Sequence, residues 1–189
     1  MLYSADRGAH WQTGNFGLID MNVLCLGISP DFKNDQAIFA GTQSGLFYSK
    51  NAGRAWREVN LPSGYDTVIS LALSPNFAQD GTLFAGTETQ GLWCSTDRGN
   101  SWDRIGQSEL SGSINQILLS PEFSREPHLL VLHDGNLFAS EDGGVSWLPW
   151  QEARFENKSA TAILAPHGFG AGAPVLVGLE DGRTLRILV

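Results

Sequence analysis

Residues 95–102 read STDRGNSW, and this short stretch decides the fold because versions of it recur along the chain. Four copies of the pattern S-x-D-x-G-x-x-W, spaced by 45, 46 and 45 residues, begin at Ser4, Ser49, Ser95 and Ser140. A second marker, reading SPDF, SPNF and SPEF, has the same spacing and begins at Ser29, Ser74 and Ser120. Two independent markers with one period indicate a repeat protein.

Every repeat has the same order of features, which is clearest between residues 67 and 106. An alternating apolar run precedes the SPxF turn, TLFAGT follows as a second run, and GLWCS follows as a third. Trp102 then begins a fourth run after the eight-residue motif. Alternation with period two and β-enriched residues predict four strands per repeat, with turns and no assigned helices between them.

A four-stranded antiparallel unit cannot bury both of its faces alone, so we predict an all-β fold in which the units stack radially as the blades of a β-propeller. A β-solenoid is the alternative, but glycine-containing hairpin turns favour antiparallel blades. We expect one propeller domain over residues 1–189. Its complete blades are predicted at 22–66, 67–111 and 112–158, with partial blades at 1–21 and 159–189.

The two partial blades allow two arrangements. In the first, the C-terminal strands accept the N-terminal outer strand, which closes about four blades within one chain. In the second, the chain is part of a larger propeller whose remaining blades have been lost or come from a second chain. Self-association that completes the propeller is therefore one expected interaction.

The eight-residue motif lies between the third and fourth strands, where a tight turn is needed. Its Asp is expected to accept backbone N–H groups, its Ser to do so more weakly, its Gly to adopt a positive φ and its Trp to pack into the blade. Asn51 replaces the Asp in the second copy and keeps the carbonyl acceptor, which favours a structural role. The expected structural residues are Ser4, Asp6, Gly8, Trp11, Ser49, Asn51, Gly53, Trp56, Ser95, Asp97, Gly99, Trp102, Ser140, Asp142, Gly144 and Trp147.

These motif residues resemble the Asp-box, or BNR, repeats of sialidases, sortilin-type receptors, xyloglucanase-like glycosidases and photosystem II assembly-factor-like propellers. The resemblance covers nearly the whole chain. It implies a propeller in which the motif lies at the blade periphery, away from the ligand site, so no catalytic role is carried over from these families.

The residues themselves also argue against two kinds of hydrolase site. A sialidase-like site, as the resemblance implies, would need three converging arginines and a nucleophilic tyrosine, but Tyr65 is the one tyrosine outside a strand beside the motif. A paired-carboxylate glycosidase would need two acids about 5 to 10 Å apart. We interpret the available loop acids as a solvated rim: Glu88, Asp134, Glu180 and Asp181, with Asp66, Glu109 and Glu152 nearby.

The composition argues against several partners. A formal charge of −8 is unsuited to nucleic acid, and no apolar run approaches the roughly 18 residues of a membrane span. The first twenty residues contain no export signal, and the compartment is left unassigned. Cys25 and Cys94 lack CxxC spacing and are expected to be small buried strand residues. His128 and His133 are expected to point to opposite faces of a strand, so we expect no metal and no cofactor.

The loops after the second strand and between blades differ in length and charge among the repeats, whereas the SPxF turn and the eight-residue motif are nearly constant. We therefore predict ligand recognition on this variable rim, which includes Gln43, Glu88, His133, Asp134, Trp150 and Arg154. The predicted function is a non-enzymatic scaffold for a protein or carbohydrate ligand, with a cationic or polar partner favoured. The alternative is a carbohydrate-active enzyme or a fragment of one.

Overall fold

The computed structural model describes residues 2–62, 64, 66–151, 155, 158–170 and 172–189. These residues form antiparallel sheets that follow one another along the sequence. A two-stranded sheet comes first and a three-stranded sheet comes last, with three four-stranded sheets between them. The predicted all-β fold of antiparallel blades is therefore confirmed.

The strand bounds follow the repeats. The first sheet contains β1 (Leu2–Tyr3) and β2 (Gln12–Thr13). The second contains β3 (Val23–Ile28), β4 (Ile38–Thr42), β5 (Gly45–Ser49) and β6 (Arg57–Val59). The third contains β7 (Val68–Leu73), β8 (Leu83–Thr87), β9 (Leu92–Ser95) and β10 (Asp103–Ile105). The fourth contains β11 (Ile114–Leu119), β12 (Leu129–His133), β13 (Asn136–Ser140) and β14 (Leu148–Pro149), and the last contains β15 (Ala160–Leu164), β16 (Pro174–Leu179) and β17 (Thr184–Leu188).

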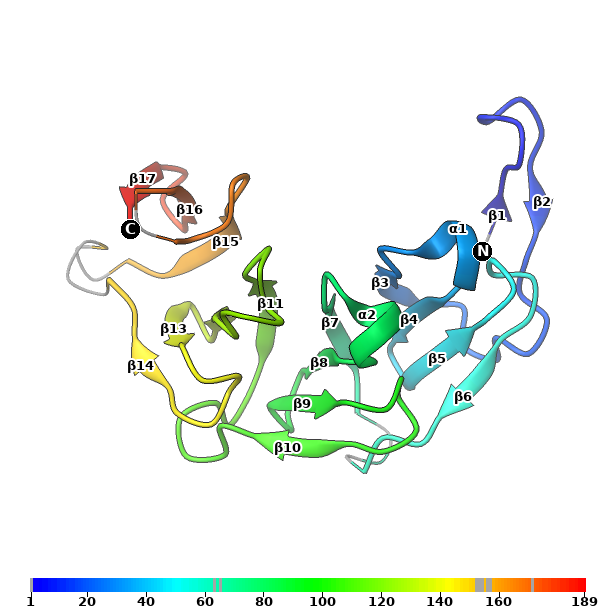
Figure 1. Cartoon of the computed structure of the whole chain (residues 1–189), viewed down its shortest axis with the longest axis horizontal. Coiled ribbons are helices and arrows are strands. Elements are labelled where there is room, and N and C mark those ends of the chain that lie inside the picture. The colour runs from blue at the N-terminus through cyan, green and yellow to red at the C-terminus, as the bar shows by residue number, and fades with distance from the viewer. Residues whose placement is uncertain (1, 63, 65, 152–154, 156–157, 171) are drawn as a thin grey trace.

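The sheets stand side by side as blades of an open arc (Figure 1). The first strands β3, β7, β11 and β15 lie on its inner side, and the fourth strands β6, β10 and β14 lie on its outer side. Sheets β1–β2 and β15–β17 are separate and lie at opposite ends of the arc. Of the two arrangements that the sequence left open, the structure therefore does not form the closure within one chain, because the packing of successive blades sets a curvature that leaves the two ends apart.

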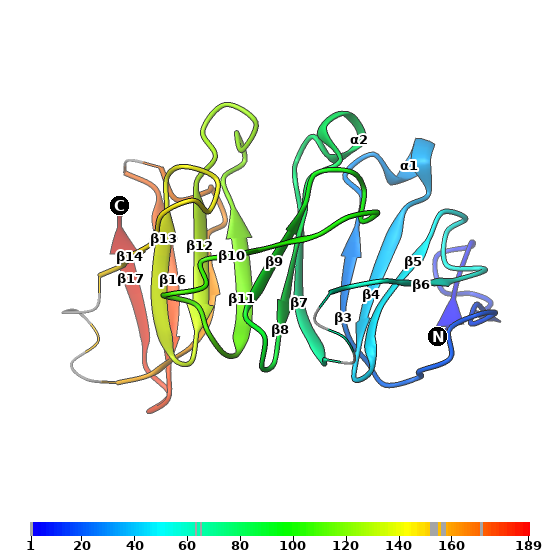
Figure 2. The same cartoon turned by 90° about the horizontal axis from the view of Figure 1, so that it is seen from below.

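Two SPxF segments contain single helical turns where the sequence predicted turns without helix. These are α1 (Phe32–Asp35) and α2 (Phe77–Asp80), and both lie along one edge of the arc (Figure 2). Ser74 Oγ accepts the N–H of Asn76 at 3.1 Å and donates to Asp80 Oδ2 at 2.6 Å. The helix ends at Gly81, whose φ of 65° is left-handed. The serine and the aspartate of this segment thus close the turn from its two ends.

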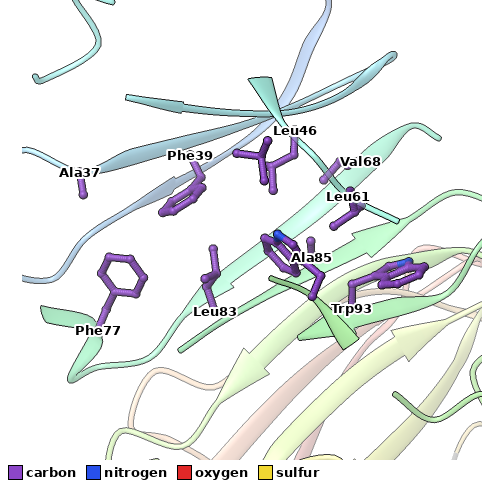
Figure 3. Packing of buried hydrophobic residues seen from close by; sticks show 11 residues of the cluster. Ala37, Phe39, Leu46, Leu61, Val68, Phe77, Leu83, Ala85 and Trp93 are labelled. Atoms are coloured by element: carbon purple, nitrogen blue, oxygen red, sulfur yellow. The ribbon is translucent and has the colours of Figure 1, made fainter. Parts of the chain in front are cut away.

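The phenylalanine of the SPxF marker explains why that marker recurs. Phe77 packs into the core between the blades β3–β6 and β7–β10, where its ring meets Phe39 edge-on at 5.8 Å (Figure 3). Phe123 meets Phe84 in the same way at 5.7 Å in the next core. The marker therefore supplies a side chain that joins neighbouring blades as well as a turn.

Both cysteines are free strand residues and both are half-buried. Burial raises the pKa of the Cys25 thiol to about 12 and that of the Cys94 thiol to about 11. Both thiols are therefore protonated at neutral pH, which suits packing rather than nucleophilic chemistry.

Candidate functional site

The serine and the aspartate of the eight-residue motif direct their side-chain oxygens at their own turn. Asp97 Oδ1 accepts the N–H groups of Asn100 at 3.0 Å and Ser101 at 2.8 Å, and Ser101 Oγ donates to Oδ2 at 2.6 Å. The Ser101 side-chain hydrogen bond is the largest cause that lowers the pKa of Asp97 to about 2. Ser95 Oγ accepts the N–H of Gly99 at 2.8 Å, so the serine is a full partner in the turn.

The turn contains a second left-handed residue that the sequence did not reveal. Gly99 has the expected positive φ, 82°, but Arg98 before it has a φ of 61°. Arg7 and Ala52 occupy the same position in the first two copies, with φ values of 60° and 59°. A left-handed residue with a side chain is uncommon, and the hydrogen bonds of the serine and aspartate hold it there.

The motif tryptophans do not all share one environment. Trp56, Trp102 and Trp147 are only 5–6% exposed, whereas Trp11 is 61% exposed. The expectation that all four pack into a core is therefore wrong for Trp11. Its blade contains only β1 and β2 among the described residues, so the strands that bury the other three are missing around it.

Three of the predicted rim residues occupy one equivalent position in successive blades. Each is the residue directly after the second strand of its blade. Its N–H donates to the carbonyl of the residue directly before the first strand of the same blade. These bonds run from Gln43 to Asn22 at 3.2 Å, from Glu88 to Thr67 at 2.9 Å and from Asp134 to Ser113 at 3.3 Å. Glu180, which was assigned to the acidic rim, repeats the bond to Ser159 at 3.0 Å. The rim is thus a regular row with one side chain per blade.

Gln43 and Glu88 line the same groove, although they belong to different blades. The groove has a volume of about 600 Å³ and opens between β3–β6 and β7–β10. Its lining residues are Met21, Asn22, Val23, Leu24, Gln43, Thr67, Ile69 and Glu88. Apolar and polar side chains are mixed, and Glu88 contributes the charge.

Hydrogen bonds hold one side of the groove in place. Asn22 Nδ2 donates to Gln43 Oε1 at 3.0 Å, and Thr67 Oγ1 donates to the Gln43 carbonyl at 3.1 Å. Gln43 is thereby tied to both blades through its side chain and its backbone. The Glu88 side chain is exposed, and its carboxylate has no hydrogen bond within the described ranges.

Two aspartates outside the set of predicted binding residues hold the loops of this groove in place. Asp20 accepts the N–H groups of Asn22 at 2.9 Å and Ser44 at 2.8 Å, and the Asn22 bond is the largest cause that lowers the pKa of Asp20. Asp66 lies in the connection between β6 and β7 and accepts the N–H of Gln90, in the loop between β8 and β9, at 2.9 Å. An acid two or three residues before the start of the first strand is the sequence signal for this role.

His133 and Trp150 differ from the other rim candidates. His133 ends β12, at the position of Thr42 and Thr87 in the earlier blades, and is buried with Nδ1 at 3.1 Å from the Ser113 carbonyl oxygen. Trp150 is half-buried against the core between β11–β14 and β15–β17. Both side chains contribute to packing, and neither lines the groove. Arg154 lies outside the described residues.

Neither a metal site nor a membrane-spanning helix is found in the part of the chain that the structure describes. No three His, Cys, Asp or Glu side chains gather there as a metal site requires. None of the helices described is long and apolar enough to cross a bilayer.

No family model and no curated protein matches the sequence. Several solved structures resemble the fold. An ancestral GH74 enzyme is 16% identical with a TM-score of 0.73, over 98% of this chain and 28% of its own. YCF48 bound to D1 peptide is 18% identical with a TM-score of 0.59, over 88% of this chain and 54% of its own. The beta-propeller domain of Myceliophteria thermophila Swd1 is 12% identical with a TM-score of 0.62, over 89% of this chain and 52% of its own.

The chain folds as a partial β-propeller. At these identities the similarities establish the fold alone, and the fold hosts both enzymes and non-enzymatic proteins. The chain spans 28% of the length of the GH74 enzyme and about half of the other two structures.

Proposed function

We propose that residues 1–189 act as one non-enzymatic binding domain whose rim groove takes an extended, basic or polar peptide. The observation that carries this proposal is the placement of Gln43 and Glu88 at one groove by two neighbouring blades. A volume of about 600 Å³ lies in the range of sites that bind small ligands and peptide side chains. The proposal requires no cofactor.

The lining of the groove suits a peptide better than a purely apolar ligand. Met21, Leu24 and Ile69 offer apolar contact, and methionine adapts its shape to different side chains. Gln43 is oriented by its bond from Asn22, which leaves its Nε2 group to donate to a peptide carbonyl. A fixed donor beside apolar surface is an arrangement that binds main chain and side chains together.

The negative charge at the groove favours a partner that carries positive charge. The Glu88 carboxylate is exposed at the groove, and Asp134 repeats its position in the next blade. Opposite charge on a partner speeds association and penalises an acidic competitor. Because both carboxylates are exposed, salt should weaken the interaction.

The comparisons support a peptide as the class of ligand without identifying it. YCF48, a propeller of similar fold, was solved with the D1 peptide bound. That interaction belongs to YCF48, and it supports the proposal because a propeller of similar fold can hold a peptide.

Binding to an array of decapeptides that differ in lysine and arginine content tests the proposal. We expect basic peptides to bind and acidic peptides to fail, with affinity falling as salt rises. Glu88→Lys should weaken binding about tenfold, which corresponds to about 1.4 kcal/mol. Glu141→Lys makes the same charge change on an exposed residue of the eight-residue motif and should have little effect.

Two results would overturn this function. One is binding that ignores peptide charge and is equally sensitive to Glu88→Lys and Glu141→Lys. The other is hydrolysis of β-glucans or fluorogenic sialosides by the purified chain, which would favour the carbohydrate-active alternative.

A further inference from the structure

The core between two neighbouring blades contains the motif tryptophan of the later blade. Trp102 belongs to the core between β3–β6 and β7–β10, and Trp147 belongs to the core between β7–β10 and β11–β14. In both places the indole is buried between two sheets, and its Nε1 donates to a carbonyl in its own turn, that of Gly99 or Gly144. The tryptophan is therefore a regular part of each of these interfaces.

Among the described residues, Trp56 is buried in a core with Leu18 of the N-terminal segment, so Trp11 is the one motif tryptophan that lies in no core. One core between two described blades, in turn, contains no motif tryptophan. Trp11 is 61% exposed beside β2. The core between β11–β14 and β15–β17 contains no motif tryptophan among its described members. The outer edge of β17 also has no partner strand in the described structure. The exposed Trp11 at one end of the arc therefore matches the core and the free strand edge at the other end.

The exposed faces of the sheets β3–β6 and β15–β17 correspond to the two faces that pack together wherever two neighbouring blades of this chain meet. Leu71 and Leu73 of β7 pack onto the preceding blade, where a Cβ on Gly27 would lie 3.4 Å from Leu71 Cβ. The equivalent residues of β3, Leu26 and Ile28, are 50% and 55% exposed. The face of β3 that should meet a preceding blade is therefore bare.

On the last sheet, β15–β17, the face that corresponds to the contact with a following blade is exposed. Ala72 of β7 and Leu118 of β11 pack toward the blade that follows each of them, and Leu164 takes their position in β15 but is 56% exposed. Gly178 takes the position of Gly86 in the second strand. A Cβ on Gly86 would lie 2.7 Å from Ile114 of the next blade, but one on Gly178 would meet nothing closer than 3.4 Å. The last sheet is thus shaped for a neighbour that the arc does not provide.

We propose that two copies of this chain close into one ring, in which the first motif of each copy completes the last blade of the other. β2 of one copy pairs with the free edge of β17 of the other, and Trp11 enters the core that lacks a tryptophan. β17 keeps the third-strand position because it pairs with β16 at five residues, whereas β1 pairs with β2 at only two. β1 is displaced.

The occupant is a second copy because the bare faces match each other and lie at opposite ends of one arc (Figure 1). Joining them repeats an interface that the chain already forms between its own blades. Each copy supplies three complete blades and shares two others, so the ring has eight blades, within the range known for propellers. Such a head-to-tail contact that closes is a stable form of assembly. This inference is independent of the proposed peptide site.

The mass of the 189-residue chain in solution tests the ring, by light scattering after gel filtration over a range of concentrations. We expect twice the chain mass of 20.5 kDa. Trp11→Ala, Leu26→Asp and Leu164→Asp should each shift the equilibrium to the monomer with unchanged circular dichroism. Val145→Asp, which places an acid on an 84% exposed apolar residue away from both faces, should leave the dimer intact.

Mixing the two charged variants provides the sharper test. In a head-to-tail ring, a copy with Leu26→Asp and a copy with Leu164→Asp still share one undamaged interface, so the mixture should regain a dimer that neither variant forms alone. A monomer at all concentrations, a larger assembly, or a dimer insensitive to Trp11→Ala and Leu164→Asp would overturn the proposal. A mixture that stays monomeric would also contradict it.

Discussion

Gln116 bridges to the backbone of Ile163 in the next blade through two hydrogen bonds. Its Nε2 donates to the Ile163 carbonyl at 2.6 Å, and its Oε1 accepts the Ile163 N–H at 2.9 Å. Ser70 holds the equivalent position one blade earlier and donates to the Ile114 carbonyl at 2.6 Å. The first strand of each of these blades is thus bonded to the first strand of the next, just after an irregularity in its pairing.

Gln116→Leu should destabilise the fold by about 1–3 kcal/mol, because it leaves both backbone groups of the buried Ile163 without their partner. Chemical unfolding would measure this loss. Asn115→Leu, at the neighbouring exposed position, serves as the control and should change the unfolding midpoint little. Equal effects of the two substitutions would show that the bridge does not join the blades.

Gly86→Ala should also be destabilising, by about 1–3 kcal/mol, because overpacking a close backbone contact forces the blades apart. The new Cβ would clash with Ser70 Oγ and lie 2.7 Å from Ile114 Cβ. Gly170→Ala adds the same methyl group where no atom lies within 4 Å, and it should be tolerated. A thermal melt of the two variants compares them, and an unchanged melt of Gly86→Ala would contradict the close packing.

Asp97→Ala should lower the unfolding midpoint without changing peptide binding, because the carboxylate bonds only to its own turn. Asp97→Asn should be milder, since an amide oxygen can still accept from the Ser101 N–H, as Asn51 Oδ1 accepts from Ala55 at 2.9 Å. Melting curves and the peptide array measure the two properties separately. Loss of binding with an unchanged midpoint would mean that the motif recognises the ligand.

The stabilising effect of Asp97 should depend on pH. Its pKa is lowered in the folded chain from 3.8 to about 2, so the folded state favours the ionised form. The contribution is therefore fully present above pH about 4 to 5 and is lost as the pH falls through about 2. The difference in melting temperature between the native chain and Asp97→Asn should shrink over this window. A constant difference from pH 7 to pH 2 would rule out this role of the carboxylate.

The candidate site was only partly predictable from the sequence. The position of Gln43, Glu88 and Asp134 after the second strand follows from the repeat spacing, so their place on one rim could be inferred. The sequence could not show that the His133 side chain is buried rather than on the rim, because His133 directly precedes Asp134. The structure turns His133 toward Ser113 and leaves Asp134 exposed, since adjacent residues at a strand end point to different sides.

The sequence by itself determined the repeat, the strand order and the turn chemistry of this protein. These features depend on neighbouring residues: alternation sets each strand, and the glycine and serine of each motif set its turn. Only the tertiary structure decided that Gln43 and Glu88 share a groove, that Gln116 reaches Ile163, and that Trp11 is exposed while Trp102 is buried. Each of these outcomes depends on how one blade packs against the next, and residues far apart in the chain are brought together only by the curvature that this packing produces.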